Sequence, residues 1–212
     1  MKTDALIDML ALGAGAAPRG VALRRLAPAA VAGLLTSALL AVGMYGLLSS
    51  WMFATSAPWI KMAYTGLLAA AALWLAARAA LPVARTTEPL RAVLTVVLVM
   101  LIAGASVMLF GTAPEQRMAS LMGQTWKQCP WNVLLLSLPA LALIFWAMRG
   151  LAPTQPRLAG FAAGLLAGAL GAFGYALSCP EASPAFIAVW YTLGVMLTGA
   201  VGAILGPRLL RW

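Results

Sequence analysis

Six long apolar segments follow one another along the chain, separated by short polar stretches. They run over Ala27–Ser49, Trp59–Leu81, Leu90–Gly111, Trp131–Met148, Leu158–Ser178 and Pro184–Gly206. Each is long enough to cross the membrane, because about 20 helical residues at 1.5 Å per residue span a hydrocarbon core about 30 Å thick. No segment alternates apolar and polar positions as the strands of a membrane barrel do. The pattern predicts an all-α, six-helix transmembrane bundle.

The composition supports a membrane protein and argues against a nucleic-acid-binding one. Hydrophobic residues make up 63% of the 212 residues and charged residues 9%, whereas about 25% of a soluble domain is charged. The net charge of +9 comes from single Lys and Arg residues spread between the apolar segments. Direct nucleic-acid binding needs a clustered basic face, which this arrangement does not provide. We expect the lipid bilayer, and not a nucleic acid, to surround or contact most of the chain.

The distribution of Lys and Arg predicts the orientation of the bundle. With the N-terminus in the cytoplasm, eleven Lys and Arg residues lie on the inner side and only Lys61, Arg117 and Lys127 on the outer side. This excess of positive charge is typical of cytoplasmic loops. An even number of spans then places the C-terminus in the cytoplasm too. The predicted division is a cytoplasmic segment, 1–26, followed by a six-helix membrane domain, 27–212.

The spans lack the groups that membrane enzymes and proton-coupled transporters use. The chain has no His, and its five acidic residues all lie in the N-terminal segment or the loops: Asp4, Asp8, Glu88, Glu115 and Glu181. Ionisable groups near the middle of the membrane are normally required for such chemistry. We therefore expect no enzymatic activity and no catalytic, cofactor-binding or metal-binding residues. Lys61 lies near the outer edge of the second span, where its side chain is expected to snorkel to the surface.

Glycines four residues apart mark one face of the fifth span. They are Gly160, Gly164 and Gly168, followed by Gly171 and Gly174, and the sixth span adds Gly202 and Gly206. Such spacing lets the backbone of a second helix approach closely. Packing within the chain is favoured over homodimerisation, and the oligomeric state stays open.

Both cysteines, Cys129 and Cys179, fall on the predicted outer side, and each precedes a proline. Because proline suits the first turn of a helix and restricts the residue before it, we expect both thiols at helix boundaries and at similar depth. The outer side of a bacterial inner membrane is oxidising, which favours a disulfide. A structural disulfide and a sensing pair fit the sequence equally well. Lys127 is close enough in sequence to lower the pKa of the Cys129 thiol, although a single loop lysine is more often simply solvated.

The N-terminal segment has the pattern of a short amphipathic helix. Thr3 can cap a helix that begins at Asp4, with Asp4 and Asp8 on one side. Leu6, Ile7 and Leu10 form an apolar stripe on another side, which predicts binding to a protein partner. The alternative is a helix lying on the membrane surface. The two acids argue against it, because anionic lipids repel them.

Several motifs together resemble a known family. They are the start Met1-Lys2-Thr3-Asp4, the run Tyr175-Ala176-Leu177 before Cys179-Pro180-Glu181, and the end Gly206-Pro207-Arg208 with Leu210-Arg211-Trp212. In these and in its six spans, the whole chain resembles the negative regulator of sigma-F (NrsF) family of bacterial membrane anti-sigma factors. The resemblance implies that the N-terminal segment holds an extracytoplasmic-function sigma factor. It also implies that the outward-facing cysteines take part in sensing the signal that releases this partner.

Two other functions remain open at this stage. The first is a small multi-pass permease, which would need polar residues along a continuous pore, and the spans offer few. The second is a membrane scaffold or assembly subunit with the glycine-rich fifth helix as its docking face. Only the anti-sigma function requires a soluble transcription factor as partner.

Overall fold

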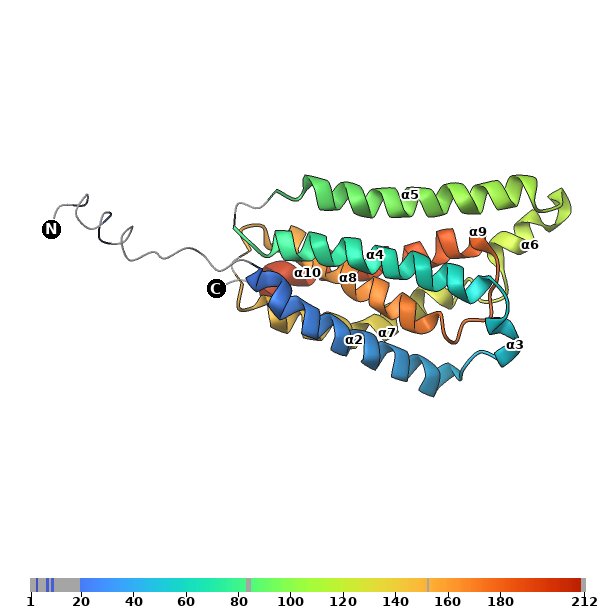
Figure 1. Cartoon of the computed structure of the whole chain (residues 1–212), viewed down its shortest axis with the longest axis horizontal. Helices are drawn as coiled ribbons and strands as arrows, with labels where there is room; N and C mark the ends of the chain where they lie inside the picture. The colour runs from blue at the N-terminus through green and yellow to red at the C-terminus, as the bar shows by residue number, and fades with distance from the viewer. Residues whose placement is uncertain are drawn as a thin grey trace.

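The computed structural model describes residues 20–82, 85–151 and 153–210, together with Thr3, Ile7 and Met9. Six long helical segments form a bundle, and short helices lie at one end of it (Figure 1). The long segments are α2 (Val21–Tyr45), α4 (Ala57–Ala79), α5 (Thr87–Phe110), α7 (Cys129–Met148), α8 (Pro156–Tyr175) and a sixth made of α9 (Pro184–Phe186), the π-helical turn η2 (Ile187–Tyr191) and α10 (Thr192–Leu209). The short ones are α3 (Ser50–Phe53), the 3-10 turn η1 (Pro114–Gln116) and α6 (Arg117–Met122).

The predicted all-α architecture with six membrane-length helices is confirmed. Within the described residues, six helical segments of 20 to 26 residues are long and apolar enough to cross a membrane. The largest difference from the predicted bounds is in α2, which begins at Val21 instead of Ala27 and therefore runs across the predicted 26/27 boundary. It ends at Tyr45 because Gly46 adopts a positive φ of 78°, a conformation that terminates the helix.

Helix α8 occupies the centre of the bundle, and α5 lies at its edge (Figure 1). The neighbours of α8 are α10, α4, α7 and α2, whereas α5 packs mainly against α4 and α9. The first residues of α2 and the last residues of α10 lie at one end of the bundle. The short helices α3 and α6 lie at the opposite end, which we call the cysteine end because Cys129 and the α8–α9 link are found there.

The glycines of α8 bring its backbone against the backbone of α10. A Cβ atom at Gly160 would overlap the Gly202 carbonyl oxygen, and one at Gly164 would overlap that of Thr198. Further along, Gly171 faces Ser137 of α7 in the same close manner. Small residues permit this approach between membrane helices. The predicted packing of the glycine face within the chain is thus confirmed.

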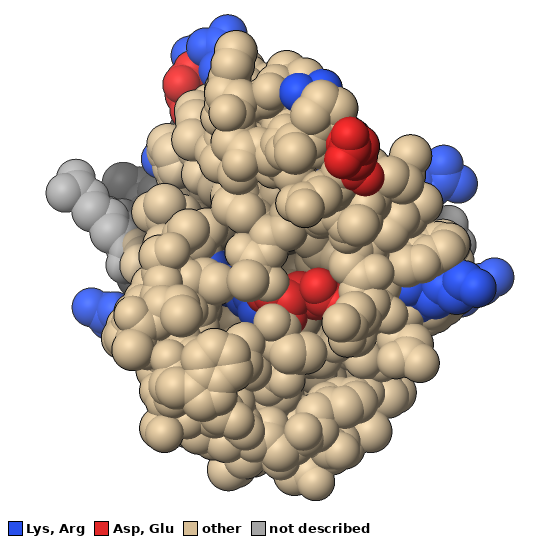
Figure 2. All heavy atoms as spheres, turned by 90° about the vertical axis from the view of Figure 1, so that its right-hand side faces the viewer, with Lys and Arg blue, Asp and Glu red and all other residues tan. Residues whose placement is uncertain are grey.

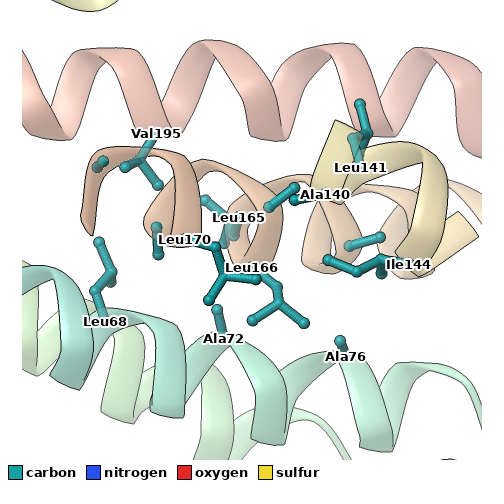
Figure 3. Packing of buried hydrophobic residues seen from close by; sticks show 14 of the residues in the cluster. Leu68, Ala72, Ala76, Ala140, Leu141, Ile144, Leu165, Leu166, Leu170 and Val195 are labelled. Atoms are coloured by element: carbon teal, nitrogen blue, oxygen red, sulfur yellow. The ribbon is translucent and has the colours of Figure 1, made fainter. Parts of the chain in front are cut away.

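The larger side chains of α8 fill the remaining space around it. Leu165, Leu166 and Leu170 belong to one buried cluster with side chains of α4, α7 and α10 (Figure 3). Leu165 lies close to Gly199 of α10, and Leu170 lies close to Gly33 of α2. Helix α2 is attached to the same core, because Ser37 Oγ donates a buried hydrogen bond of 2.8 Å to the Leu136 carbonyl of α7. The result is a packed unit of α2, α4, α7, α8 and α10.

Candidate functional site

The two cysteines lie at helix boundaries of the cysteine end, as predicted. Cys129 is the first residue of α7, and Cys179 follows the end of α8 in the link to α9. Their backbone N–H groups donate to the carbonyls four residues earlier, at 2.9 Å to Thr125 and 3.0 Å to Tyr175. Both side chains are completely buried.

Lys61 of α4 also belongs to this site. Its side chain is completely buried, and Nζ donates a hydrogen bond of 2.6 Å to the carbonyl oxygen of Cys179. The prediction that Lys61 snorkels to the surface is therefore wrong. The reason is a partner that is near in space but distant in sequence. The link after α8 turns its Cys179 carbonyl toward α4, so the ammonium finds a hydrogen-bond acceptor inside the protein.

Glu181 ties the Cys179 link to the segment that precedes Cys129. Its Oε1 atom accepts from the backbone N–H groups of Gln124 and Thr125, at 2.7 and 2.9 Å, and from Thr125 Oγ1 at 3.0 Å. Gly123 has a positive φ of 54°, and a Cβ there would overlap the Glu181 carboxylate. Glycine is thus required at 123 for both the turn and the close approach of the carboxylate.

These contacts join both cysteines and α4 into one hydrogen-bonded unit. Lys61 binds the Cys179 carbonyl, Glu181 follows two residues later and accepts from Thr125, and the Thr125 carbonyl accepts from Cys129. Figure 2 looks onto this end of the molecule and shows acidic atoms at one place in a hollow near its middle. A chain of hydrogen bonds therefore connects the backbone of both cysteines with α4.

Two buried tyrosines contact each other at the cysteine end, and one of them, Tyr175, accepts from α7, which begins at Cys129. The rings of Tyr175 and Tyr191 lie 5.9 Å apart, and Asn132 Nδ2 donates to Tyr175 Oη at 3.2 Å. Tyr191 sits in the π-helical turn η2, a feature often found at functional sites. Its buried hydroxyl and that of Ser178 make no hydrogen bond with any described residue.

The predicted disulfide is not formed in this structure, where Cys129 and Cys179 are free thiols. Lys127 is exposed and lies over the ring of Trp126, with Nζ 5.4 Å from the ring centroid. Among His, Cys, Asp and Glu in the described ranges, no three lie together as potential metal ligands.

Most of the predicted partner-binding residues cannot be placed. Asp4, Leu6, Asp8 and Leu10 lie outside the described residues. Ile7 is helical and its side chain is 57% exposed. An exposed apolar side chain is consistent with the predicted stripe but does not test its role.

The sequence analysis missed two members of the site. Lys61 was assigned to the surface and Glu181 to an ordinary loop position, whereas both hold the link that carries Cys179. The signal that could have found Glu181 is its place in Cys179-Pro180-Glu181, because a carboxylate next to a turn commonly binds backbone N–H groups. For Lys61 the signal is a charge four residues inside an apolar helix, which is costly unless it is paired.

Comparison with known proteins identifies the family. A family model described as negative regulator of sigma F (NrsF) matches residues 10–212. The chain belongs to the NrsF family. It is 41% identical over 214 residues to the probable anti-sigma-F factor NrsF of Azospira oryzae, and 39% identical over 221 residues to the anti-sigma-F factor NrsF of Caulobacter vibrioides. Both alignments cover the whole of each chain.

No solved structure matches the chain significantly. The NrsF family match starts at residue 10, so Asp4, Leu6, Ile7 and Asp8 precede it. The resemblance predicted from the sequence motifs is nevertheless confirmed over almost the whole length.

Proposed function

We propose that the chain is a membrane anti-sigma factor that binds an extracytoplasmic-function sigma factor through its N-terminal segment, 1–26. A signal received at Cys129 and Cys179 releases this partner. The observation that carries the proposal is the similarity, over the whole chain, to two relatives named as anti-sigma-F factors. Family membership fixes neither the class of sigma factor nor the sensing residues, which rest on the arguments that follow.

The proposed orientation places the N-terminal segment in the cytoplasm of a bacterium and the cysteine end outside the inner membrane. The excess of Lys and Arg in the inner segments supports it. The start of α2 and the end of α10 share one end of the bundle, opposite the cysteine end (Figure 1). Reporter fusions after Arg85 should read cytoplasmic, and fusions within 112–128 should read external. The reverse result would invert the proposed direction of signalling.

The packing of α2 offers a route from the cysteine end to the N-terminal segment. Helix α2 is bonded to α7, which begins at Cys129, through Ser37 and the Leu136 carbonyl. It also lies against α8, which leads into Cys179, because a Cβ at Gly174 would meet the backbone of Ser37 and Ala38. We infer that a shift of α7 or α8 moves α2, whose first residues, from Val21, form the end of the proposed binding segment 1–26.

The energy needed sets a limit on this switch. Changing a partner from 99% bound to 1% bound requires about 5.5 kcal/mol of differential stabilisation. One hydrogen bond to a charged group contributes about 1.5 to 3 kcal/mol. Loss of the Lys61 contact alone is therefore too small, whereas loss of the Lys61 and Glu181 contacts together is of the required size. We infer that release involves the whole hydrogen-bonded unit.

The experiment that tests the function is co-purification. The full chain, solubilised from its native membranes, should retain a sigma factor of the extracytoplasmic-function class, identified by mass spectrometry. Deleting residues 1–12 should abolish this retention while the six helices stay inserted. Retention of the sigma factor at full strength by the truncated protein would place the binding site in the inner loops instead.

A matched pair of substitutions tests the apolar stripe more finely. Ile7 and Met9 are both helical and similarly exposed, at 57% and 59%, but only Ile7 belongs to the proposed stripe. Residues two apart on a helix point in different directions. Ile7→Asp should reduce binding of the sigma factor, and Met9→Asp should leave it nearly unchanged. Equal losses would show that the segment binds without the proposed face.

Replacing the cysteines tests the sensing step separately. Cys129→Ser and Cys179→Ser should leave the chain folded and bound to the sigma factor but should abolish its release by the inducing signal. Normal release from both variants would remove the cysteines from the proposal without affecting the anti-sigma function.

A further inference from the structure

A cleft opens at the cysteine end and is lined by immediate sequence neighbours of both cysteines. Its volume is about 350 Å³, and its walls come from the end of α2, from α3, from the segment leading into α7 and from the end of α8. Gln128, which lines the cleft, directly precedes Cys129, and Ser178 and Pro180, which also line it, directly flank Cys179. The cleft therefore borders the backbone segments next to both cysteines.

The lining of the cleft mixes polar and apolar residues, among them Leu48 and Met52, and includes no charged residue. Hydroxyl and amide groups such as those of Ser49, Thr125 and Asn132 alternate with the rings of Tyr45 and Tyr175. The rings of these two tyrosines meet edge to face, with centroids 5.7 Å apart. A charged solute that entered would lose water, which is costly. The lining supplies no counter-charge of its own, and the Glu181 carboxylate next to Thr125 is already hydrogen-bonded. An uncharged solute loses much less.

Ser178 supplies an unsatisfied polar group in the wall. Its residue is only 9% exposed, and its hydroxyl makes no hydrogen bond with any described residue. Buried hydroxyl groups are normally paired, and leaving one unpaired is costly. A small molecule with a hydrogen-bonding group could satisfy it directly next to Cys179.

We propose that this cleft is the entrance through which small uncharged thiol-reactive molecules reach Cys179 and Cys129. Both thiols have no exposed surface, so a reagent must displace part of the wall. Pro180 and Gln128 are exposed and line the cleft, and they are the sequence neighbours of Cys179 and Cys129. Lys61, which is bonded to the Cys179 carbonyl, does not line the cleft. The proposal concerns access only and holds whether or not the chain binds a sigma factor.

The probe is methyl methanethiosulfonate, a small uncharged reagent. The cysteine sulfur attacks the sulfenyl sulfur of the reagent, a new sulfur–sulfur bond forms, and methanesulfinate leaves with the electron pair of the broken bond. The thiol proton passes to water. The reagent is its own oxidant, so no further component is needed. Mass spectrometry of peptides then gives the extent of modification at each cysteine over time.

The experiment uses the full chain in lipid nanodiscs, where both membrane faces are accessible. The uncharged probe should modify both cysteines of the folded protein. The charged sulfonatoethyl and trimethylammonioethyl methanethiosulfonates should react at least about tenfold more slowly, because they must shed water to enter. Equal rates for all three reagents would overturn the proposed selectivity. No reaction with the uncharged probe before unfolding would overturn the entrance itself.

Two adjacent serines provide matched variants. Ser49 and Ser50 are both exposed, but only Ser49 lines the cleft. Ser49→Trp should slow modification of the cysteines by about tenfold, and Ser50→Trp should leave the rate unchanged. Unchanged rates in both variants, with the helical content preserved, would place the route elsewhere. Sigma-factor retention, measured on the same variants, distinguishes this failure from a failure of the proposed function.

Discussion

Helices α5 and α8 show opposite relations between hydropathy and burial. The most apolar stretch of α5 has a mean hydropathy of 2.7, and 17% of its residues are buried. The corresponding stretch of α8 has a mean hydropathy of only 1.6, yet 83% of its residues are buried. In a soluble protein the more apolar helix would be expected at the centre. In hydrocarbon, by contrast, apolar character does not drive a helix inward, and the six membrane-length apolar helices of this chain are compatible with that surrounding.

The side chains of the two helices explain the difference. Helix α5 carries large aliphatic residues, and Leu98, Val99 and Ile102 are each 56% to 60% exposed. Helix α8 carries glycine and alanine at its contacts, so that neighbouring backbones come close to it. Close packing and hydrogen bonds, and not the removal of apolar surface from water, hold the bundle together. The predictions that follow test this distinction.

The largest expected effect is at a glycine of α8. In Gly164→Leu, the new side chain must overlap the backbone of Thr198 and Gly199 in α10, and backbone cannot move aside cheaply. We expect a loss of about 3 kcal/mol or more, at the upper end of the cost of overpacking, with much of the protein misfolded. Thermal unfolding in detergent micelles, followed by circular dichroism, measures it.

The control is a glycine with open space around it. A Cβ at Gly43 of α2 would have nothing within 4 Å. Gly43→Leu should therefore leave the unfolding temperature nearly unchanged. If both variants lost stability equally, the cost would come from helix propensity or insertion, and the close packing of α8 would not be the cause.

A smaller effect is expected at Lys61, which is held to the Cys179 link by a hydrogen bond and not by close packing of glycine. In Lys61→Met, the Cys179 carbonyl loses its hydrogen bond, which costs about 1 to 3 kcal/mol, while removal of a buried charge offsets part of this loss. The helices should stay folded. The Cys179 link should open more often, so N-ethylmaleimide should alkylate Cys179 several times faster.

Lys127 is the matched control for that measurement, because it is exposed and its ammonium lies over the ring of Trp126. Lys127→Met should not change the alkylation rate of Cys179. An equal rate in the Lys61→Met variant and the parent protein would mean that Lys61 does not hold the link.

The sequence predicted the helices well and the contacts at the cysteine end poorly. The helices follow from runs of about 20 apolar residues, a local property of the chain. The glycine face of α8 was also readable, because Gly160 and Gly164 lie one turn apart on the helix. Neither property requires knowledge of which helices are neighbours.

The contacts of the site depend on neighbours far away in the sequence. Lys61 and Cys179 are 118 residues apart, and Glu181 lies 56 residues from Thr125. Nothing local to Lys61 shows that a carbonyl group will reach it, so the expectation of snorkelling was reasonable and wrong. The shared helix-boundary position of the two cysteines was predictable only because each stands before a proline.

A modest effect is expected for a hydrogen bond between two membrane helices. Tyr64 Oη and Thr192 Oγ1 lie 2.6 Å apart and join α4 to α10. Such bonds average about 0.6 kcal/mol in membrane proteins, so Tyr64→Phe should lower the free energy of unfolding by about that amount. A double-mutant cycle with Thr192→Val isolates the pair. Ser106→Ala in α5 is the control, because Ser106 bonds only within its own helix, to the Ala103 carbonyl. A coupling energy of zero would show that the bond does not stabilise the bundle.

The smallest effect is expected on the lipid-facing side of α5. Leu98 is 56% exposed, so Leu98→Ala replaces one contact with hydrocarbon by another and leaves no internal cavity. The free energy of unfolding should change by less than about 0.5 kcal/mol.

Leu166 of α8 is the matched comparison, because it is 1% exposed and Leu166→Ala leaves a space among α4, α7 and α8. Its cost comes from lost packing, since the unfolded side chain would also lie in lipid, and should clearly exceed that of Leu98→Ala. Steric trapping in a bilayer measures both variants. Equal losses would mean that α5 is covered by a partner in the membrane, and that its exposed aliphatic face is an interface.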